Sequence, residues 1–292
     1  MRTSVISLFL GAALASVPLA SATELHAFSD SSRLVAIGGS LTEIVYALGE
    51  EARLVGRDQT ATYPDAAAAL PDVGYARQLA PEGVLSVGPT ALLVLEGSGP
   101  PEALEVLAAA GVEYQTVPES YSAEGVISKI LAVGEALGIE QKASAYADEV
   151  QAQFAALDKV TATIEAPKRV LFVLSVEGGK IQASGTGTAA DGMIALAGAE
   201  NAITDYSGYK ALTEEAIVSA APDAIVMMDR GGDHAATDAE LLAHPAIALT
   251  PVAANKAIYR LDGTYLLGFG PRAAQAATEL YNMLYGEQAQ AE

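Results

Sequence analysis

The chain has 292 residues, a formal net charge of −20 and no cysteine. Such an acidic surface is a poor partner for nucleic acid and is repelled by the anionic lipid of a membrane. Without cysteine there is no disulfide framework, no thiolate metal site and no cysteine for a lipid anchor. The length fits one large domain or two ordinary ones.

The first residues are typical of a secretory signal peptide. Arg2 supplies the positive start, residues 5–20 are largely apolar, and residues 20–22 read Ala-Ser-Ala, which fits the small-x-small cleavage rule. A membrane anchor is the alternative, but the apolar run is short, contains Pro18 and is not followed by a basic stop. We therefore predict a cleaved signal peptide over residues 1–22 and a periplasmic protein without a lipid anchor.

The first predicted elements are a strand and a helix. Residues 33–37 read as a short buried strand, and a Gly-Gly-Ser turn leads into a helix over about residues 41–48. Ser40 is the expected N-cap of this helix, and Glu43 stands three residues later, as a capping box requires.

Two later segments repeat one pattern. Residues 82–94 and 215–227 both read Glu, aliphatic residues at helical spacing, a proline and then an apolar run, and their starts differ by 133 positions (215 − 82). That offset is too long for a solenoid repeat. The pattern instead predicts two similar lobes, and a cleft between lobes is where small ligands usually bind.

A helical segment separates the two halves. Residues 139–163 are alanine-rich and amphipathic and predict one long connecting helix, after which residues 169–174 read as a strand and residues 188–197 as a helix. We therefore predict an α/β fold of two Rossmann-like lobes, over residues 30–138 and 167–292, with mainly parallel central sheets. A rigid helical connection permits only small movements of the lobes.

Catalytic signatures are weak. The sequence has no G-x-S-x-G elbow, no cysteine nucleophile and no histidine pair at zinc spacing. Its three histidines are His26, His234 and His244, of which only His234 lies in a loop that could reach a cleft. The glycines of residues 183–188 do not complete a dinucleotide-binding fingerprint. We expect a binding protein rather than an enzyme.

The segment over residues 70–79 contains Tyr75 and, two positions later, Arg77. A tyrosine in a loop is most often a surface anchor. The functional alternative is that the guanidinium stabilises a phenolate, which is a hard anionic ligand suited to ferric iron and a known type of axial haem ligand. The residues alone leave both interpretations open.

The whole mature chain resembles the periplasmic haem-binding proteins of bacterial ABC importers. These belong to a helix-linked receptor class that also holds vitamin B12 and siderophore binders. The most specific segments are the tyrosine segment and Tyr-Leu-Leu-Gly-Phe-Gly-Pro-Arg at residues 265–272. The supporting segments are residues 35–45, 72–79, 81–85, 187–191 and 208–210.

The resemblance implies that Tyr75 is the axial ligand of haem iron and that Arg77 is the partner of its phenolate. It also implies that Arg230, Tyr209 and Lys210 lie near the haem. Some relatives carry a histidine ligand just after the first strand of the second lobe. Residues 175–179 read Ser-Val-Glu-Gly-Gly here, so a second protein ligand is not implied, and His234 is only a weak candidate.

The partner that the resemblance implies is a permease dimer with its cytoplasmic ATPase, approached by a monomeric receptor. Glu82 and Glu215 open the two repeat copies and resemble the acidic pair that docks on that dimer. The alternative is that both are acids favoured by a helix dipole. The competing functions are a ferric-siderophore or corrinoid receptor of the same class, a secreted α/β enzyme, and a protein with a cofactor-chelatase-like fold. The chain has no tryptophan and only 16 lysines and arginines, which argues against a siderophore site.

Overall fold

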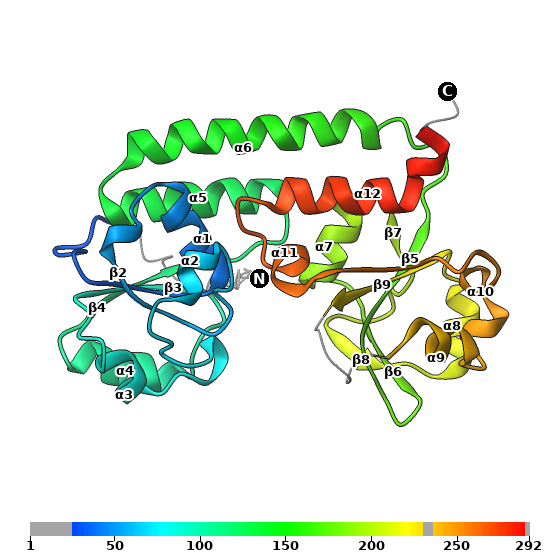
Figure 1. The fold of residues 1–292 in the computed structure, drawn as a ribbon, viewed down its shortest axis with the longest axis horizontal. Helices are drawn as coiled ribbons and strands as arrows, with labels where there is room; N and C mark the ends of the chain where they lie inside the picture. The colour runs from blue at the N-terminus through cyan, green and yellow to red at the C-terminus, as the bar shows by residue number, and fades with distance from the viewer. Residues whose placement is uncertain (1–24, 230–235, 290–292) are drawn as a thin grey trace, which may run out of the picture.

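The computed structural model describes residues 25–229 and 236–289. They form two lobes, each built around its own β-sheet, with a long helix running across both (Figure 1). Within the described ranges no helix combines the length and the apolar character needed to cross a membrane.

The N-terminal sheet is entirely parallel, in the order β2-β1-β3-β4. Its central strand β1 is buried along its whole length, which explains its continuous apolar sequence. The strands are β1 (Leu34–Ile37), β2 (Leu54–Arg57), β3 (Ala91–Leu95) and β4 (Glu113–Val117). The helices are α1 (Gly39–Ala47), α2 (Asp65–Ala68), α3 (Pro81–Leu85), α4 (Pro101–Ala109) and α5 (Ala123–Leu137).

The C-terminal sheet has the order β10-β9-β5-β6-β8, and β7 also pairs with β5. Strands β10, β9, β5 and β7 pair in parallel, whereas β6 runs antiparallel to both of its neighbours. The reversal occurs at Gly178 and Gly179, which both adopt the positive φ that a tight hairpin turn requires. The strands are β5 (Arg169–Glu177), β6 (Lys180–Ser184), β7 (Glu200–Asn201), β8 (Tyr209–Ala211), β9 (Ala224–Asp229) and β10 (Ile258–Asp262).

Among the described residues, six α-helices accompany the second sheet. They are α7 (Ala189–Leu196), α8 (Glu214–Ala220), α9 (Asp238–Ala243), α10 (Pro251–Asn255), α11 (Gly263–Leu267) and α12 (Ala273–Ala289). The α3–β3 and α8–β9 units are the two copies of the sequence repeat, so the predicted α/β fold with similar lobes is confirmed.

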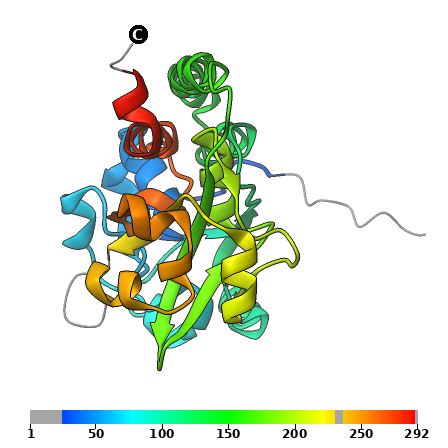
Figure 2. The ribbon, with the colours of Figure 1, turned by 90° about the vertical axis from the view of Figure 1, so that its right-hand side faces the viewer.

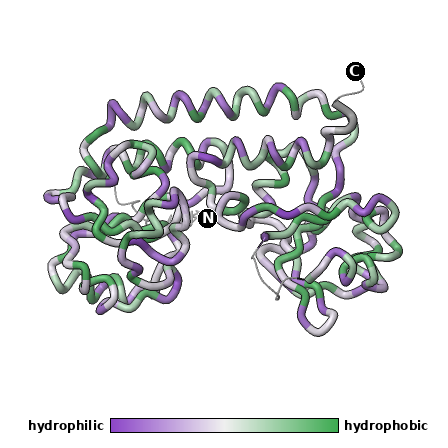
Figure 3. Tube along the Cα trace, in the orientation of Figure 1, coloured by the Kyte–Doolittle hydropathy of each residue, from purple (hydrophilic) through white to green (hydrophobic). Residues whose placement is uncertain are grey.

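The connecting helix is α6 (Glu140–Thr161). Gly138, in the left-handed conformation, ends α5 and lets the chain turn into α6. The buried residues of α6 recur at steps of three and four, which is the spacing of a single apolar face, and Figure 3 shows the resulting alternation of hydropathy along it. That face packs on α5 and α12, and the three helices are seen nearly end-on in Figure 2. The lobe boundaries at residues 30–138 and 167–292 remain predictions.

The start of α1 differs from the prediction. The helix begins at Gly39 and its N-cap is Gly38, so Ser40 lies inside the first turn and the predicted capping box is wrong. The cap comes from the loop after β2, because the Asp58 carboxylate accepts a hydrogen bond from the Gly38 N–H at 2.9 Å and the Thr60 hydroxyl accepts one from Gly39 at 2.8 Å. This long-range cap leaves Glu43 free to contact the other lobe.

Candidate functional site

A cavity with a volume of about 620 Å³ lies between the lobes, and two others, in the C-terminal lobe, have volumes of about 470 and 440 Å³. Both lobes line the first cavity, and its size is typical of a small-molecule site. The N-terminal lobe contributes residues 38–40, Tyr75, Arg77, residues 95–98, Glu119 and Tyr121. The C-terminal lobe contributes Leu174, residues 187–189, Tyr209, Met228, residues 263–264 and residues 267–268.

Tyr75 and Arg77 lie together in the wall of this cleft. Tyr75 precedes a short 3-10 helix, η2 (Ala76–Gln78), and remains 39% exposed, so its ring is open to a ligand. Burial raises the pKa values of Tyr121 and Tyr209, and the positive charge of Arg77 opposes that rise in both. Arg77 is therefore close enough to act electrostatically on tyrosines of both lobes.

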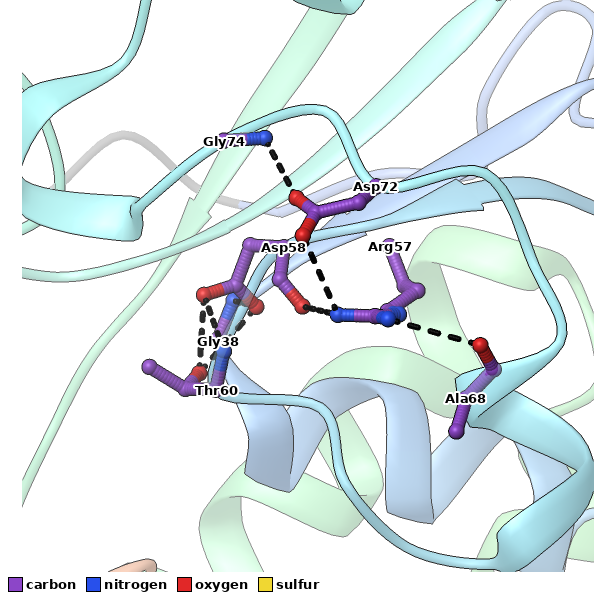
Figure 4. A network of polar contacts seen from close by, with 7 residues as sticks. All are labelled: Gly38, Arg57, Asp58, Thr60, Ala68, Asp72 and Gly74. Carbon is purple, nitrogen blue, oxygen red and sulfur yellow. Dashed lines mark hydrogen bonds and ion pairs between the residues drawn. The ribbon is translucent and has the colours of Figure 1, made fainter.

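The loop that carries Tyr75 is attached to the end of β2 (Figure 4). The Asp72 carboxylate accepts a hydrogen bond from the Gly74 N–H at 2.8 Å and lies 3.6 Å from the Arg57 guanidinium. Backbone hydrogen bonds from Val73 to Arg57 and from Gln59 to Gly74 complete the attachment. Because Gly74 has a φ of 110°, a residue with a side chain would be strained there. The backbone before Tyr75 is thus held in one conformation.

Tyr209 forms the opposite wall of the cleft. Its ring contacts Phe172 edge-on, with 6.4 Å between the ring centroids. Hydrogen bonds at its hydroxyl, from the Thr188 side chain and the Ala190 backbone at the start of α7, partly offset the pKa rise that burial causes. Tyr209 therefore presents mainly its ring to the cleft.

Lys210 does not lie in the cleft with Tyr209. Successive residues of a strand point to opposite faces, so Lys210 on β8 faces away from the cleft. Its ammonium lies 4.9 Å from the centre of the Tyr206 ring, in the separate cavity of about 470 Å³. The expectation that Lys210 lines the cleft is wrong for this reason.

Two predicted site residues, Arg230 and His234, lie outside the described residues. Residues 175–179, where the expected histidine ligand is missing, form the end of β5 and the turn into β6. Across residues 25–229 and 236–289, His, Cys, Asp and Glu nowhere gather in a group of three that could hold a metal ion.

An ion pair between the lobes was not predicted from the sequence. The Arg272 guanidinium contacts both oxygens of the Glu43 carboxylate, at 2.9 and 3.0 Å. Its central carbon lies 3.6 Å from the centre of the Tyr63 ring and 5.0 Å from that of Tyr265. This planar stacking and two-point pairing is the geometry in which arginine binds strongly, so Arg272 connects α1 to the start of α12.

A buried lysine lies beneath the cleft. Lys129 of α5 is 0% exposed, and its ammonium donates to the Glu119 carboxylate at 2.7 Å and to the Phe269 carbonyl at 3.0 Å. It also lies 3.4 Å from the Ser40 hydroxyl. Glu119 and Ser40 line the cleft, whereas Phe269 belongs to the C-terminal half. Lys129 therefore connects the floor of the cleft to the contact between the lobes.

Two solved structures match the chain over nearly its whole described length. One is the periplasmic haem-binding protein BhuT in complex with two haems, with 40% identity, a TM-score of 0.83 and coverage of 87% of this chain and 98% of that chain. The other is the periplasmic haem-binding protein RhuT from Roseiflexus sp. RS-1 in apo form, with 38% identity, a TM-score of 0.83 and coverage of 88% and 99%.

Curated relatives are more distant. An uncharacterised ABC transporter substrate-binding lipoprotein, YvrC of Bacillus subtilis, is 27% identical over 259 residues, which are 88% of this chain and 81% of the relative. A cobalamin-binding protein of Halobacterium salinarum is 29% identical over 215 residues, 72% of this chain but only 57% of the relative. A family model for periplasmic binding proteins matches residues 34–265, so the chain belongs to the periplasmic binding protein family.

Proposed function

We propose that this protein captures ferric haem in the periplasm and delivers it to the permease of an ABC importer. The observation that carries the proposal is an exposed tyrosine with an arginine two residues later, in the wall of an interlobe cleft. The 40% identity to a periplasmic haem-binding protein supports it.

In the proposed complex, the Tyr75 phenolate is the axial ligand of ferric iron and Arg77 compensates its negative charge. The rings of Tyr121 and Tyr209 give the porphyrin aromatic walls from the two lobes, and Leu174 and Met228 add apolar surface. Arg230 remains a proposed contact of the haem, and His234 a weak proposed second ligand of the iron.

A corrinoid or ferric-siderophore receptor is the alternative within the same family. The match to a cobalamin-binding protein favours the corrinoid, but its identity is lower and it covers little more than half of that relative. Titration of the purified protein with haemin and with cyanocobalamin, followed by absorption spectroscopy, separates the two. We expect haemin to cause a saturable change of the Soret band and cyanocobalamin not to bind. Binding of cyanocobalamin, with no Soret change in the haemin titration, would refute the proposal.

Asp72 is expected to position Tyr75. Replacing Asp72 with alanine removes the acceptor of the Gly74 N–H and the partner of Arg57, and should weaken haemin binding about 10-fold, as loss of groups that orient a metal ligand typically does. Asp72→Asn keeps an acceptor for Gly74 and should retain most of the affinity. Asp65→Ala removes a nearby exposed charge on α2 and is the control. Equal affinity of the Asp72→Ala and Asp65→Ala variants in haemin titrations would contradict this role.

Glu82 and Glu215 are proposed to dock on basic pockets of the permease dimer. Both side chains are exposed on equivalent short helices, α3 and α8. The double variant Glu82→Lys/Glu215→Lys should abolish haem uptake by cells and leave the haemin titration unchanged. Glu135→Lys/Glu149→Lys places the same charges on exposed positions of α5 and α6 and should leave uptake intact. If cells with Glu82→Lys/Glu215→Lys still took up haem, the two glutamates would have no docking role, and the repeat would only reflect duplication of the lobes.

We further propose that residues 1–22 export the chain and are removed, and that the mature receptor acts as a monomer. Mass spectrometry of the secreted protein tests the cleavage site directly.

A further inference from the structure

The exposed aliphatic side chains of this protein are unevenly distributed. In the described part of the chain, six leucines and valines are largely exposed. Two of them, Leu131 and Val160, lie on α5 and α6. The other four lie on α3 and α8, which carry Glu82 and Glu215, or on the elements packed against those helices. Exposed apolar side chains that gather in one region commonly mark an interaction surface.

Two of the four occupy equivalent positions in the repeat. Leu85 follows Glu82 by three residues and Val218 follows Glu215 by three, and their exposures are 37% and 38%. The residue before each, Val84 or Ile217, is buried, so the two helices have the same orientation on their lobes. Positions three apart on a helix are neighbours. Each lobe therefore presents a carboxylate beside an aliphatic side chain.

The elements that pack on these two helices carry the other two exposed side chains. Helix α4 packs on α3 and contributes Val106, which is 51% exposed. The 3-10 helix η3 (Ile247–Leu249) packs on α8 and contributes Leu249, which is 74% exposed. Glu215, Val218, Pro245 and Leu249 line one groove of about 440 Å³.

We propose that Leu85 and Val106 on one lobe, and Val218 and Leu249 on the other, form the apolar half of the surface that docks on the permease. This rests on the proposed function and names the contacts beside the two glutamates. A two-fold symmetric membrane protein fits because it offers the same surface twice, once to each patch. Its matching sites would each hold a basic pocket beside an apolar one.

Charge argues against other occupants. A second copy of this chain would bring further carboxylates against Glu82 and Glu215, in a protein with a net charge of −20. Anionic lipid would meet the same repulsion. A partner with basic and apolar surface satisfies both halves of each patch, and the apolar contacts supply affinity that salt does not screen.

The test measures binding of the receptor variants to the permease–ATPase complex of the host bacterium, held in lipid nanodiscs. Leu249→Ser should raise the dissociation constant about 10-fold, which is the loss expected when one leucine is no longer buried at an interface. The loss of affinity caused by Leu249→Ser should be the same at about 50 mM and about 500 mM salt. The loss of affinity caused by Glu215→Gln should become smaller as the salt concentration rises. The matched controls are Leu131→Ser on α5 and Val160→Ser on α6, because these two helices lie on the other side of the molecule from α3, α4 and α8 (Figure 1).

Equal binding by Leu249→Ser and the two controls would overturn the proposal. So would a dimer of the receptor, seen by light scattering, that Leu249→Ser dissolves, because the occupant would then be a second copy. Haemin titration of the same proteins separates the two hypotheses. All variants should bind haemin like the unmodified protein, and failure of the unmodified protein to bind haemin would refute the proposed function without touching the docking result.

Discussion

Replacing Tyr75 with phenylalanine is expected to abolish the phenolate-to-iron charge-transfer absorption of the ferric haem complex. The substitution removes one oxygen and keeps the ring, so the cleft retains its shape while the iron loses its anionic ligand. Loss of a group that merely supports a metal ligand weakens binding about 10- to 100-fold, and loss of the ligand itself should exceed the upper value. Absorption titration with haemin measures both the spectrum and the affinity.

Two other tyrosines of the same cleft provide the controls. Tyr121→Phe and Tyr209→Phe each remove a hydroxyl from the cleft wall, but in the proposed complex neither hydroxyl binds iron. Both variants should keep the charge-transfer band and most of the affinity, and Tyr75→Ala should behave at least as poorly as Tyr75→Phe. If Tyr75→Phe kept the charge-transfer band and Tyr209→Phe lost it, the iron ligand would be Tyr209 of the other lobe instead of Tyr75.

The fold could be predicted where the sequence carries a local period. The apolar face of α6 and the two helix–proline–strand units follow from spacing alone, because the side chains that pack together lie three, four or two residues apart. The antiparallel β6 depends instead on a two-glycine turn, and the cap of α1 comes from Asp58, 20 positions after the Gly38 N–H that it accepts. Neither leaves a periodic pattern in the sequence.

In the candidate site, too, residues close together in the sequence could be predicted and contacts between distant residues could not. Tyr75 and Arg77 were candidates because they lie two positions apart in one loop and in a segment that carries the family resemblance, whereas Glu119, Tyr121 and Lys129 were not predicted as site residues. Lys129 contacts Phe269 across 140 positions, and a lysine in an amphipathic helix is normally placed on the solvent face. Lys210 was misplaced because its neighbour Tyr209 does face the cleft, and strand alternation separates the two. Contacts between the lobes have no signal in a single sequence.

Replacing Lys129 with methionine is expected to lower the free energy of unfolding by about 3–5 kcal/mol, the usual cost of breaking a buried ion pair by removing one partner. The methionine fills the space of the lysine stem, but the Glu119 carboxylate, 11% exposed, loses its counter-charge and the Phe269 carbonyl loses its donor. Urea unfolding measures the loss. The double variant Lys129→Met/Glu119→Gln removes both charges and should recover most of it. A single variant as stable as the unmodified protein would show that water replaces the lysine.

The pH dependence of that loss identifies its cause. Burial raises the pKa of Glu119 above its usual 4.5, and the Lys129 charge opposes the rise. Without that charge, the folded state of Lys129→Met binds a proton that the unfolded state has already released above about pH 4.5. Its stability therefore falls as pH rises from there to the raised pKa of the folded state. The deficit in the free energy of unfolding should be small in acid and should grow as the pH rises, whereas the double variant, which lacks the carboxylate, should show no such change. A deficit independent of pH would mean that packing around Lys129, rather than an unpaired carboxylate under the cleft, determines the stability of the interlobe contact.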